Sequence, residues 1–316
     1  MAFQTLSTAW GFVRTLCFIL WKSIVHWLKP SEKDLTEDVI LITGGGRGIG
    51  RSLALQFAQK QPKHIILWER NEAALSHTAK EVQMLGVNCS FMVCDVSSKD
   101  QVYALAKEVQ AKFGHVTILV NNAGVVNPGS FLVNKNEKIE QTLHTNTFAH
   151  FWTTRAFLPS MIESNRGHIV TVSSMLGLAG LNGVVDYCTS KFAVTGFSEA
   201  LKMELRDMGV TGVNLTTVHP YLVDNAMFAG ATTRFPSLFP PVTEKYLSQK
   251  ITAAVLSNRS VLCVPKLMYF VVLFYCIAPV SAVLAVMKFL QVNKTIDNLH
   301  SQTSADSSLL VKRPST

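Results

Sequence analysis

The chain has 316 residues, which is enough for one large α/β domain with additional segments. Only 16% of the residues are charged and the mean hydropathy is +0.24, so some apolar surface is expected to meet lipid or a partner. The net charge of +8 is spread along the chain without an array of aromatic residues. This pattern argues against a nucleic-acid-binding protein and favours a membrane surface or a phosphate-bearing cofactor as the partner.

The N-terminal segment, residues 5–29, carries an apolar stripe interrupted by charge. Its members recur at steps of three and four: Leu6, Trp10, Val13, Cys17, Trp21, Ile24 and Leu28. This spacing predicts a helix that lies in a membrane interface, so residues 1–33 are interpreted as a membrane anchor. An amphipathic helix packed on the domain is the alternative. A signal peptide is disfavoured because charges interrupt the apolar run and no small-residue cleavage site follows it.

Between residues 38 and 265, short apolar runs alternate with helical patterns. The runs that predict buried parallel strands are Val39–Ile42, His64–Trp68, Cys89–Cys94, Ile118–Val120, His168–Val172, Val213–Val218 and Val261–Val264. The helical patterns include Arg51–Gln59, Glu72–Leu85, Gln101–Phe113, Lys138–Ser164 and Lys191–Met208. Strand and helix repeated in this order predict a single Rossmann-like α/β domain with a doubly wound parallel sheet.

A glycine-rich turn follows the first predicted strand and leads directly into a helical pattern. Its sequence is Thr43-Gly44-Gly45-Gly46-Arg47-Gly48-Ile49-Gly50. Glycines let the backbone approach a pyrophosphate closely, and the helix N-terminus supplies free N–H groups and the positive end of a dipole. A strand before such a turn and a helix after it predict a binding site for NAD or NADP.

The second predicted strand ends at Glu69 and Arg70, where a dinucleotide-binding fold selects the ribose. Glu69 would accept hydrogen bonds from the ribose hydroxyls and repel a 2′-phosphate, which favours NAD. Arg70 and Arg47 would pair with that phosphate, which favours NADP. The choice of coenzyme therefore stays open. Asp95 follows the third predicted strand, directly before Val96, and is a candidate acceptor for the adenine amino group.

Tyr187 and Lys191 lie four residues apart at the start of a helical pattern, which places both side chains on one face. A phenol is a poor base at neutral pH, and a nearby ammonium favours the phenolate. Ser174 follows the fifth predicted strand, and its hydroxyl could stabilise charge that develops on a substrate oxygen. The three residues together predict proton transfer to or from an alcohol or carbonyl.

The six cysteines show no CxxC pair and no zinc-finger spacing, so no metal site is expected.

Near the C-terminus, Lys266 and Lys288 bracket the uncharged stretch Leu267–Met287, which would be long enough to span a bilayer if it were straight. Pro279 in its middle predicts a kink or a shallow hairpin. Residues 266–290 are therefore expected to associate with a membrane, and helices that cover a cleft are the alternative. Residues 303–316 are polar, rich in serine and threonine, and predicted to be disordered.

These motifs together resemble the classical short-chain dehydrogenase/reductase family, from about Asp38 to Val264. Thr43–Gly50 matches its TGxxxGxG loop, and Asn121-Asn122-Ala123-Gly124 matches its NNAG motif. The resemblance implies that Asn146, Ser174, Tyr187 and Lys191 form the catalytic tetrad. It also assigns Asn122, Ala123, Gly124, Pro220 and Val223 to the coenzyme site. Tyr221 stands where the family has glycine after Pro220, so the usual contact to the coenzyme carboxamide is expected to be rearranged.

A closer resemblance is to membrane-bound retinol and retinal dehydrogenases and to 17β-hydroxysteroid dehydrogenases of the lipid-droplet type. The segments that carry it are Asp186–Lys191, Phe235–Pro241 and Val264–Tyr269. It implies hydride transfer between NAD(P)(H) and a hydrophobic alcohol or carbonyl, with retinol or retinal as the expected substrate. A steroid or fatty-acid-derived substrate, or a membrane scaffold that retains the fold, are the alternatives. The resemblance also implies an endoplasmic reticulum membrane or lipid-droplet location, a cytosol-facing domain and a homodimer built on Lys138–Ser164 and Lys191–Met208.

Overall fold

A computed structural model describes Trp10, residues 13–18, Trp21, and residues 32–231, 233–237 and 239–292. The chain divides into two compact units, Met1–Asp34 and Leu35–Thr316. In the first unit, Trp10, residues 13–18 and Trp21 are helical and exposed. Most of the predicted membrane anchor and all of the predicted tail, residues 303–316, lie outside the described residues.

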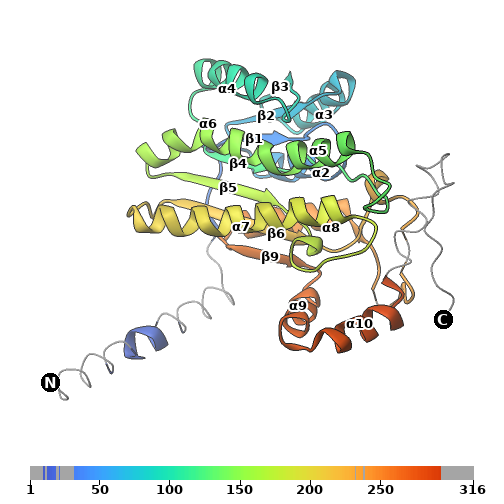
Figure 1. Ribbon diagram of the computed structural model, residues 1–316. Helices are drawn as coiled ribbons and strands as arrows, with labels where there is room; N and C mark the ends of the chain where they lie inside the picture. The colour runs from blue at the N-terminus through green and yellow to red at the C-terminus, as the bar shows by residue number, and fades with distance from the viewer. Residues whose placement is uncertain are drawn as a thin grey trace. The chain divides into compact units, whose positions relative to one another are not determined.

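The second unit is built on a parallel sheet of seven strands, in the order β3-β2-β1-β4-β5-β6-β9 (Figure 1). The strands are β1 Val39–Thr43, β2 His64–Glu69, β3 Cys89–Val93, β4 Ile118–Asn121, β5 Gly167–Val172, β6 Val213–Pro220 and β9 Val261–Val264. Two short strands, β7 Val223–Asp224 and β8 Val242–Thr243, pair separately. The seven strands expected from the apolar runs are confirmed, because buried parallel strands are apolar on both faces.

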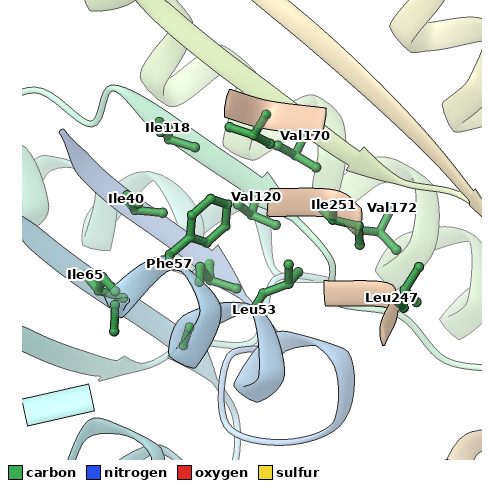
Figure 2. Packing of buried hydrophobic residues seen from close by; sticks show 14 of the residues in the cluster. Ile40, Leu53, Phe57, Ile65, Ile118, Val120, Val170, Val172, Leu247 and Ile251 are labelled. Carbon is green, nitrogen blue, oxygen red and sulfur yellow. The ribbon is translucent and has the colours of Figure 1, made fainter. Parts of the chain in front are cut away.

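Helices cover both faces of the sheet. They are α2 Gly48–Ala58, α3 Glu72–Met84, α4 Lys99–Phe113, α5 Asn136–Leu143, α6 Ala149–Glu163, α7 Val185–Asp207 and α8 Glu244–Leu256. On one face α2, α3 and α8 share a buried cluster with the strands, in which Phe57 of α2 and Ile251 of α8 lie over Val120 of β4 (Figure 2). On the other face α4, α6 and α7 bury Val102, Phe157 and Leu205. The fold is therefore the expected doubly wound α/β sandwich.

The predicted continuous helix Lys138–Ser164 is wrong in one respect. The structure divides it into α5, a π-helical segment at His144–Phe148 and α6. The buried residues around the π turn are polar, so apolar periodicity could not reveal the extra residue. The helix predicted at Lys191–Met208 starts earlier, at Val185, so Tyr187 and Lys191 both lie in its first two turns.

The strand order reverses between β1 and β4, and ligands of open α/β sheets bind at such a point. Thr43 at the end of β1 donates a hydrogen bond to the Val120 carbonyl at 3.2 Å and accepts one from the Asn122 amide at 3.0 Å. The Asn122 side chain donates in turn to the Thr43 carbonyl at 3.0 Å. These bonds fix the glycine-rich turn against the NNAG segment.

Two apolar helices follow the sheet, α9 Met268–Ile277 and α10 Val280–Phe289. Ala278, the residue before Pro279, is extended, as expected before a proline, and this ends α9. The Tyr269 hydroxyl ties α9 to β9, because it donates to the Val261 carbonyl and accepts from the Cys263 amide, both at 3.1 Å. The break predicted at Pro279 is confirmed. In the part of the chain that the structure describes, no helix is both long enough and apolar enough to cross a bilayer.

Candidate active site

A cavity of about 650 Å³ lies at the carboxyl ends of the strands. Its lining includes most of the residues singled out from the sequence: Gly44, Arg47, Gly48, Ile49, Glu69, Arg70, Asp95, Val96, Asn122, Ala123, Gly124, Ser174, Tyr187, Lys191, Pro220 and Val223. The fold thus brings the candidate coenzyme residues and three of the four candidate catalytic residues to one space.

Three of the predicted residues, Thr43, Gly50 and Asn146, support the cavity from behind rather than line it. Gly50 lies against the backbone of Gly44: a Cβ atom at Gly50 would stand 1.9 Å from the Gly44 carbonyl oxygen. No side chain fits there, so the tight loop that an approaching pyrophosphate requires depends on this glycine. The glycine-rich turn therefore fits a dinucleotide coenzyme.

At the adenosine end, acidic and basic side chains alternate. The Glu69 side chain is 12% exposed, and its Oε1 accepts a hydrogen bond from the Arg70 amide at 2.9 Å. Arg47 Nη2 lies 3.9 Å from the same oxygen, and Arg70 Nη1 lies 3.7 Å from Asp95 Oδ2. Each arginine thus lies within ion-pair distance of a carboxylate.

At the other end, the first turns of α7 bring Tyr187 and Lys191 together with Ser174. Tyr187 and Lys191 are each 4% exposed and Ser174 is 8% exposed. Lys191 Nζ donates to the Val172 carbonyl at 2.9 Å and lies 5.6 Å from the centre of the Tyr187 ring. Ser174 begins the 3-10 turn Met175–Gly177, and its Oγ accepts from the Leu176 amide at 3.1 Å.

Burial controls the protonation of this group. It raises the pKa of the Tyr187 phenol above its ordinary value, while a hydrogen bond from Ser174 acts in the opposite direction. It also lowers the pKa of Lys191 to about 8. The sequence suggested that Lys191 lowers the phenol pKa, whereas in the protein the group that lowers it is Ser174.

Asn146 lies in the π-helical segment and is completely buried. Its Oδ1 accepts from the Val125 amide at 2.8 Å, and its Nδ2 donates to the Val125 carbonyl at 2.8 Å and to Ser190 Oγ at 3.0 Å. The side chain is therefore engaged in holding the segment after β4 against α7. Any water that Asn146 holds must be bound by its main chain.

Residues 38–234 match the family model described as short chain dehydrogenase. The chain belongs to the short-chain dehydrogenase family. Short-chain dehydrogenase/reductase 3 of Homo sapiens is 39% identical over 290 residues, covering 92% of this chain and 95% of that protein. Retinol dehydrogenase 10 of Homo sapiens is 39% identical over 307 residues, covering 87% of this chain and 90% of that protein. A short-chain dehydrogenase/reductase from Burkholderia phymatum, solved in complex with NAD, superposes with a TM-score of 0.68 at 25% identity, covering 76% of this chain and 93% of that chain.

As a member of this family, the chain is an NAD(P)-dependent oxidoreductase similar to retinol dehydrogenases. One residue that lines the short-chain dehydrogenase site, Glu244, belongs to none of the sequence motifs. It is the first residue of α8, and its Oε1 would lie 3.3 Å from a Cβ atom added at Gly48 in the glycine-rich turn. Burial raises the pKa of Glu244. Glu244 lies far from Gly48 in the sequence, and its only signal was an acidic residue at a helix start.

The buried Lys191 ammonium makes the stability of this short-chain dehydrogenase depend on pH. Its pKa of about 8 in the folded protein lies below the ordinary value of about 10.4, so the unfolded chain binds the proton more tightly. The free energy of unfolding should therefore rise with pH between these two values, by about 3 kcal/mol from this group. We expect Lys191→Met to be stabilised relative to the wild type at pH 7 and to lose that advantage as the pH approaches about 10.4.

Denaturant unfolding of the coenzyme-free proteins across that pH range measures the difference. Taking the difference cancels the titration of groups that both proteins share. Lys107→Met, at an exposed position of α4, is the matched control and should show a difference that does not change with pH. A pH-independent difference for Lys191→Met would contradict the prediction.

Proposed function

We propose that this short-chain dehydrogenase interconverts a hydrophobic alcohol and its carbonyl compound, with retinol and retinal as the substrate pair. The observation that carries the proposal is the apolar wall of the cavity that Tyr187 and Ser174 also line. That wall includes Met175, Leu176, Leu181, Met227, Phe228, Ala231 and Val292. Such a wall gains free energy by burying a long apolar molecule and offers few partners to a polar one. The relatives named retinol dehydrogenases support the same substrate class.

The coenzyme, when bound, supplies or accepts a hydride at its nicotinamide ring. The glycine-rich turn and the N-terminus of α2 would hold its pyrophosphate, because free N–H groups converge there. Glu69 and Asp95 would bind the adenosine, and Pro220 and Val223 would contact the nicotinamide. Tyr221, which replaces the usual glycine, lines the same cavity and leaves less room beside Pro220.

The chain's own residues then handle the proton. During reduction, the Tyr187 hydroxyl gives its proton to the substrate oxygen, and during oxidation the phenolate takes it back. Ser174 donates a hydrogen bond to the same oxygen as negative charge develops on it. Lys191 holds the nicotinamide ribose and keeps a positive charge near the phenol. Asn146 connects the relay to water through its main chain.

The proposal is tested with protein purified in detergent and supplied with NAD(H) or NADP(H). Retinol, retinal, a steroid alcohol and ethanol are compared by the change in coenzyme absorbance. We expect kcat/KM for retinol to exceed that for ethanol by at least about 100-fold, since each buried methylene contributes about 0.8 kcal/mol. Equal turnover of ethanol, or turnover of the steroid alone, would contradict the retinoid assignment.

We propose further that α9 and α10 contact a membrane, of the endoplasmic reticulum or a lipid droplet, with the domain on the cytosolic side. Large apolar side chains stand in solvent on both helices: Ile277 is 73% exposed, Val280 is 74% exposed and Phe270 is 70% exposed. Val292, just after α10, lines the cavity, so a lipid-soluble substrate could enter from this side. Exposed Trp10 and Trp21 support a second contact through the N-terminal segment.

The membrane contact predicts a specific loss of binding. Ile277→Asp/Val280→Asp should lower the fraction of protein that sediments with phospholipid vesicles several-fold, because charge at the helix surface opposes burial in lipid. Met84→Asp/Leu85→Asp, at exposed apolar positions where α3 ends, is the matched control and should sediment like the wild type. Deleting residues 1–29 should also release protein from the vesicles. If the Ile277→Asp/Val280→Asp variant sediments with the vesicles like the wild type, α9 and α10 do not form the proposed contact.

We also propose a homodimer that pairs α6 and α7 of two chains. Phe148 and Phe192 are 41% and 45% exposed on this side of the domain. Phe151 of α6 contacts Phe197 of α7, with ring centres 4.5 Å apart, so the two helices present one continuous aromatic face. Exposed aromatic side chains of this kind are typical of protein interfaces.

A further inference from the structure

His219 is a buried histidine behind the candidate catalytic serine. It lies near the end of β6, directly before Pro220, and is only 1% exposed. Its Nδ1 lies 3.0 Å from the main-chain carbonyl oxygen of Ser174, a hydrogen-bond distance. The contact joins β6 to the segment that follows β5, just beyond the paired residues Val172 and Val218.

The protonation state of His219 follows from its surroundings. Burial lowers the pKa of the ring, so the imidazole is neutral at physiological pH. A carbonyl oxygen can only accept, so Nδ1 must carry the hydrogen and donate it. The charged groups that face the ring are Glu199 and Lys191, both on α7. His219 therefore acts as a neutral donor with a fixed tautomer.

The serine segment has few other links to the sheet. The Ser174 carbonyl also accepts from the Gly177 amide at 2.9 Å, but that bond lies within the turn that Ser174 itself begins. Ser173 is held more firmly: its amide donates to the Val218 carbonyl at 2.9 Å and its Oγ donates to the Lys191 carbonyl at 3.0 Å. The histidine thus extends to Ser174 the anchoring that β6 already provides to Ser173.

We propose that His219 is a positioning residue, whose hydrogen bond to the Ser174 carbonyl orients the Ser174 hydroxyl toward Tyr187 and the substrate oxygen. The inference rests on the catalytic roles proposed above for Ser174 and Tyr187. It assigns His219 no contact with substrate or coenzyme, so its effects must pass through Ser174.

The proposal predicts an effect on rate and on pH dependence together. A Ser174 hydrogen bond lowers the pKa of Tyr187, and a displaced serine would lose that influence. In the oxidation direction Tyr187 must be deprotonated, so the rising limb of the kcat/KM profile should move to higher pH when His219 no longer holds the serine. A purely structural role would lower the yield or the melting temperature without moving this limb.

Three substitutions of His219 distinguish a positioning role from a purely structural role. His219→Leu and His219→Gln remove the donor at the Nδ1 position, whereas His219→Asn keeps an N–H group there. We expect the Leu and Gln variants to lose about 10- to 100-fold in kcat, with the limb displaced upward and the KM for coenzyme unchanged. The Asn variant should recover most of the rate and the original profile. The Gln variant keeps a polar side chain and provides the measurement if the Leu variant does not fold.

A double substitution decides whether the effect passes through the serine. Ser174→Ala/His219→Gln should be no slower than Ser174→Ala alone, because a positioning residue has nothing left to position. Additive losses would overturn the inference, as would a folded Gln variant with the wild-type rate and pH profile. If Ser174→Ala itself retains full activity, the proposed catalytic role of Ser174 fails instead. The two failures are therefore distinguishable.

Discussion

Tyr187→Phe should lower kcat in both directions by about 1,000-fold, the middle of the range for general acid–base catalysis. The substitution removes one hydroxyl group from a residue that is 4% exposed and stands beside Lys191 and Ser174. The ring still fills the same space, so the fold and coenzyme affinity should remain. The loss should therefore appear in kcat and not in the dissociation constant of the coenzyme, measured by nicotinamide fluorescence.

Tyr246→Phe is the matched control, because it makes the same change at a position of α8 that is 42% exposed. This variant should keep the wild-type rate. In the wild type, burial raises the pKa of Tyr187, so oxidation should accelerate as the pH rises and reduction should slow. Retention of activity by Tyr187→Phe would contradict the proposed mechanism. If Tyr187→Phe is inactive but fully restores a cellular phenotype, the protein acts there as a scaffold.

The sequence predicted the central sheet well because its inner strands are buried on both faces and are largely apolar. Val120 and Ile40 illustrate this, since neither has a solvent-facing alternative. The coenzyme loop was equally predictable, because Gly50 has no room for any side chain beside Gly44. Where a local physical constraint allows only one type of residue, the local structure can be predicted from the sequence.

Other features depend on contacts between distant segments, and the sequence carries no local trace of them. In the π-helical turn, the Asn146 side chain bonds to Val125 and Ser190, both remote along the chain. Glu244 and His219 reach the site only after the sheet is assembled. For the same reason the dominant influence on Tyr187, its burial, could not be read from the spacing to Lys191.

Glu69→Ala should shift the coenzyme preference from NAD toward NADP by about 100-fold in the ratio of kcat/KM values. In the wild type, Glu69 lines the cavity with only 12% of its side chain exposed, so the ribose end of the site meets a carboxylate. A 2′-phosphate placed there would be repelled, while the ribose hydroxyls of NAD would donate hydrogen bonds. Hydrogen bonds to a charged group contribute about 1.5 to 3 kcal/mol each, which corresponds to about 10- to 100-fold.

The same substitution also releases Arg47, which lies 3.9 Å from Glu69 in the wild type, to pair with a phosphate. Adding Arg47→Ala to Glu69→Ala should therefore cancel the gain in NADP use while the loss of NAD use remains. Glu72→Ala removes an equal charge from an exposed position at the start of α3 and should leave the ratio unchanged. Steady-state kinetics with both coenzymes at saturating substrate provide the ratio. A wild type that already prefers NADP would show that the arginines, and not Glu69, control the ribose end of the site.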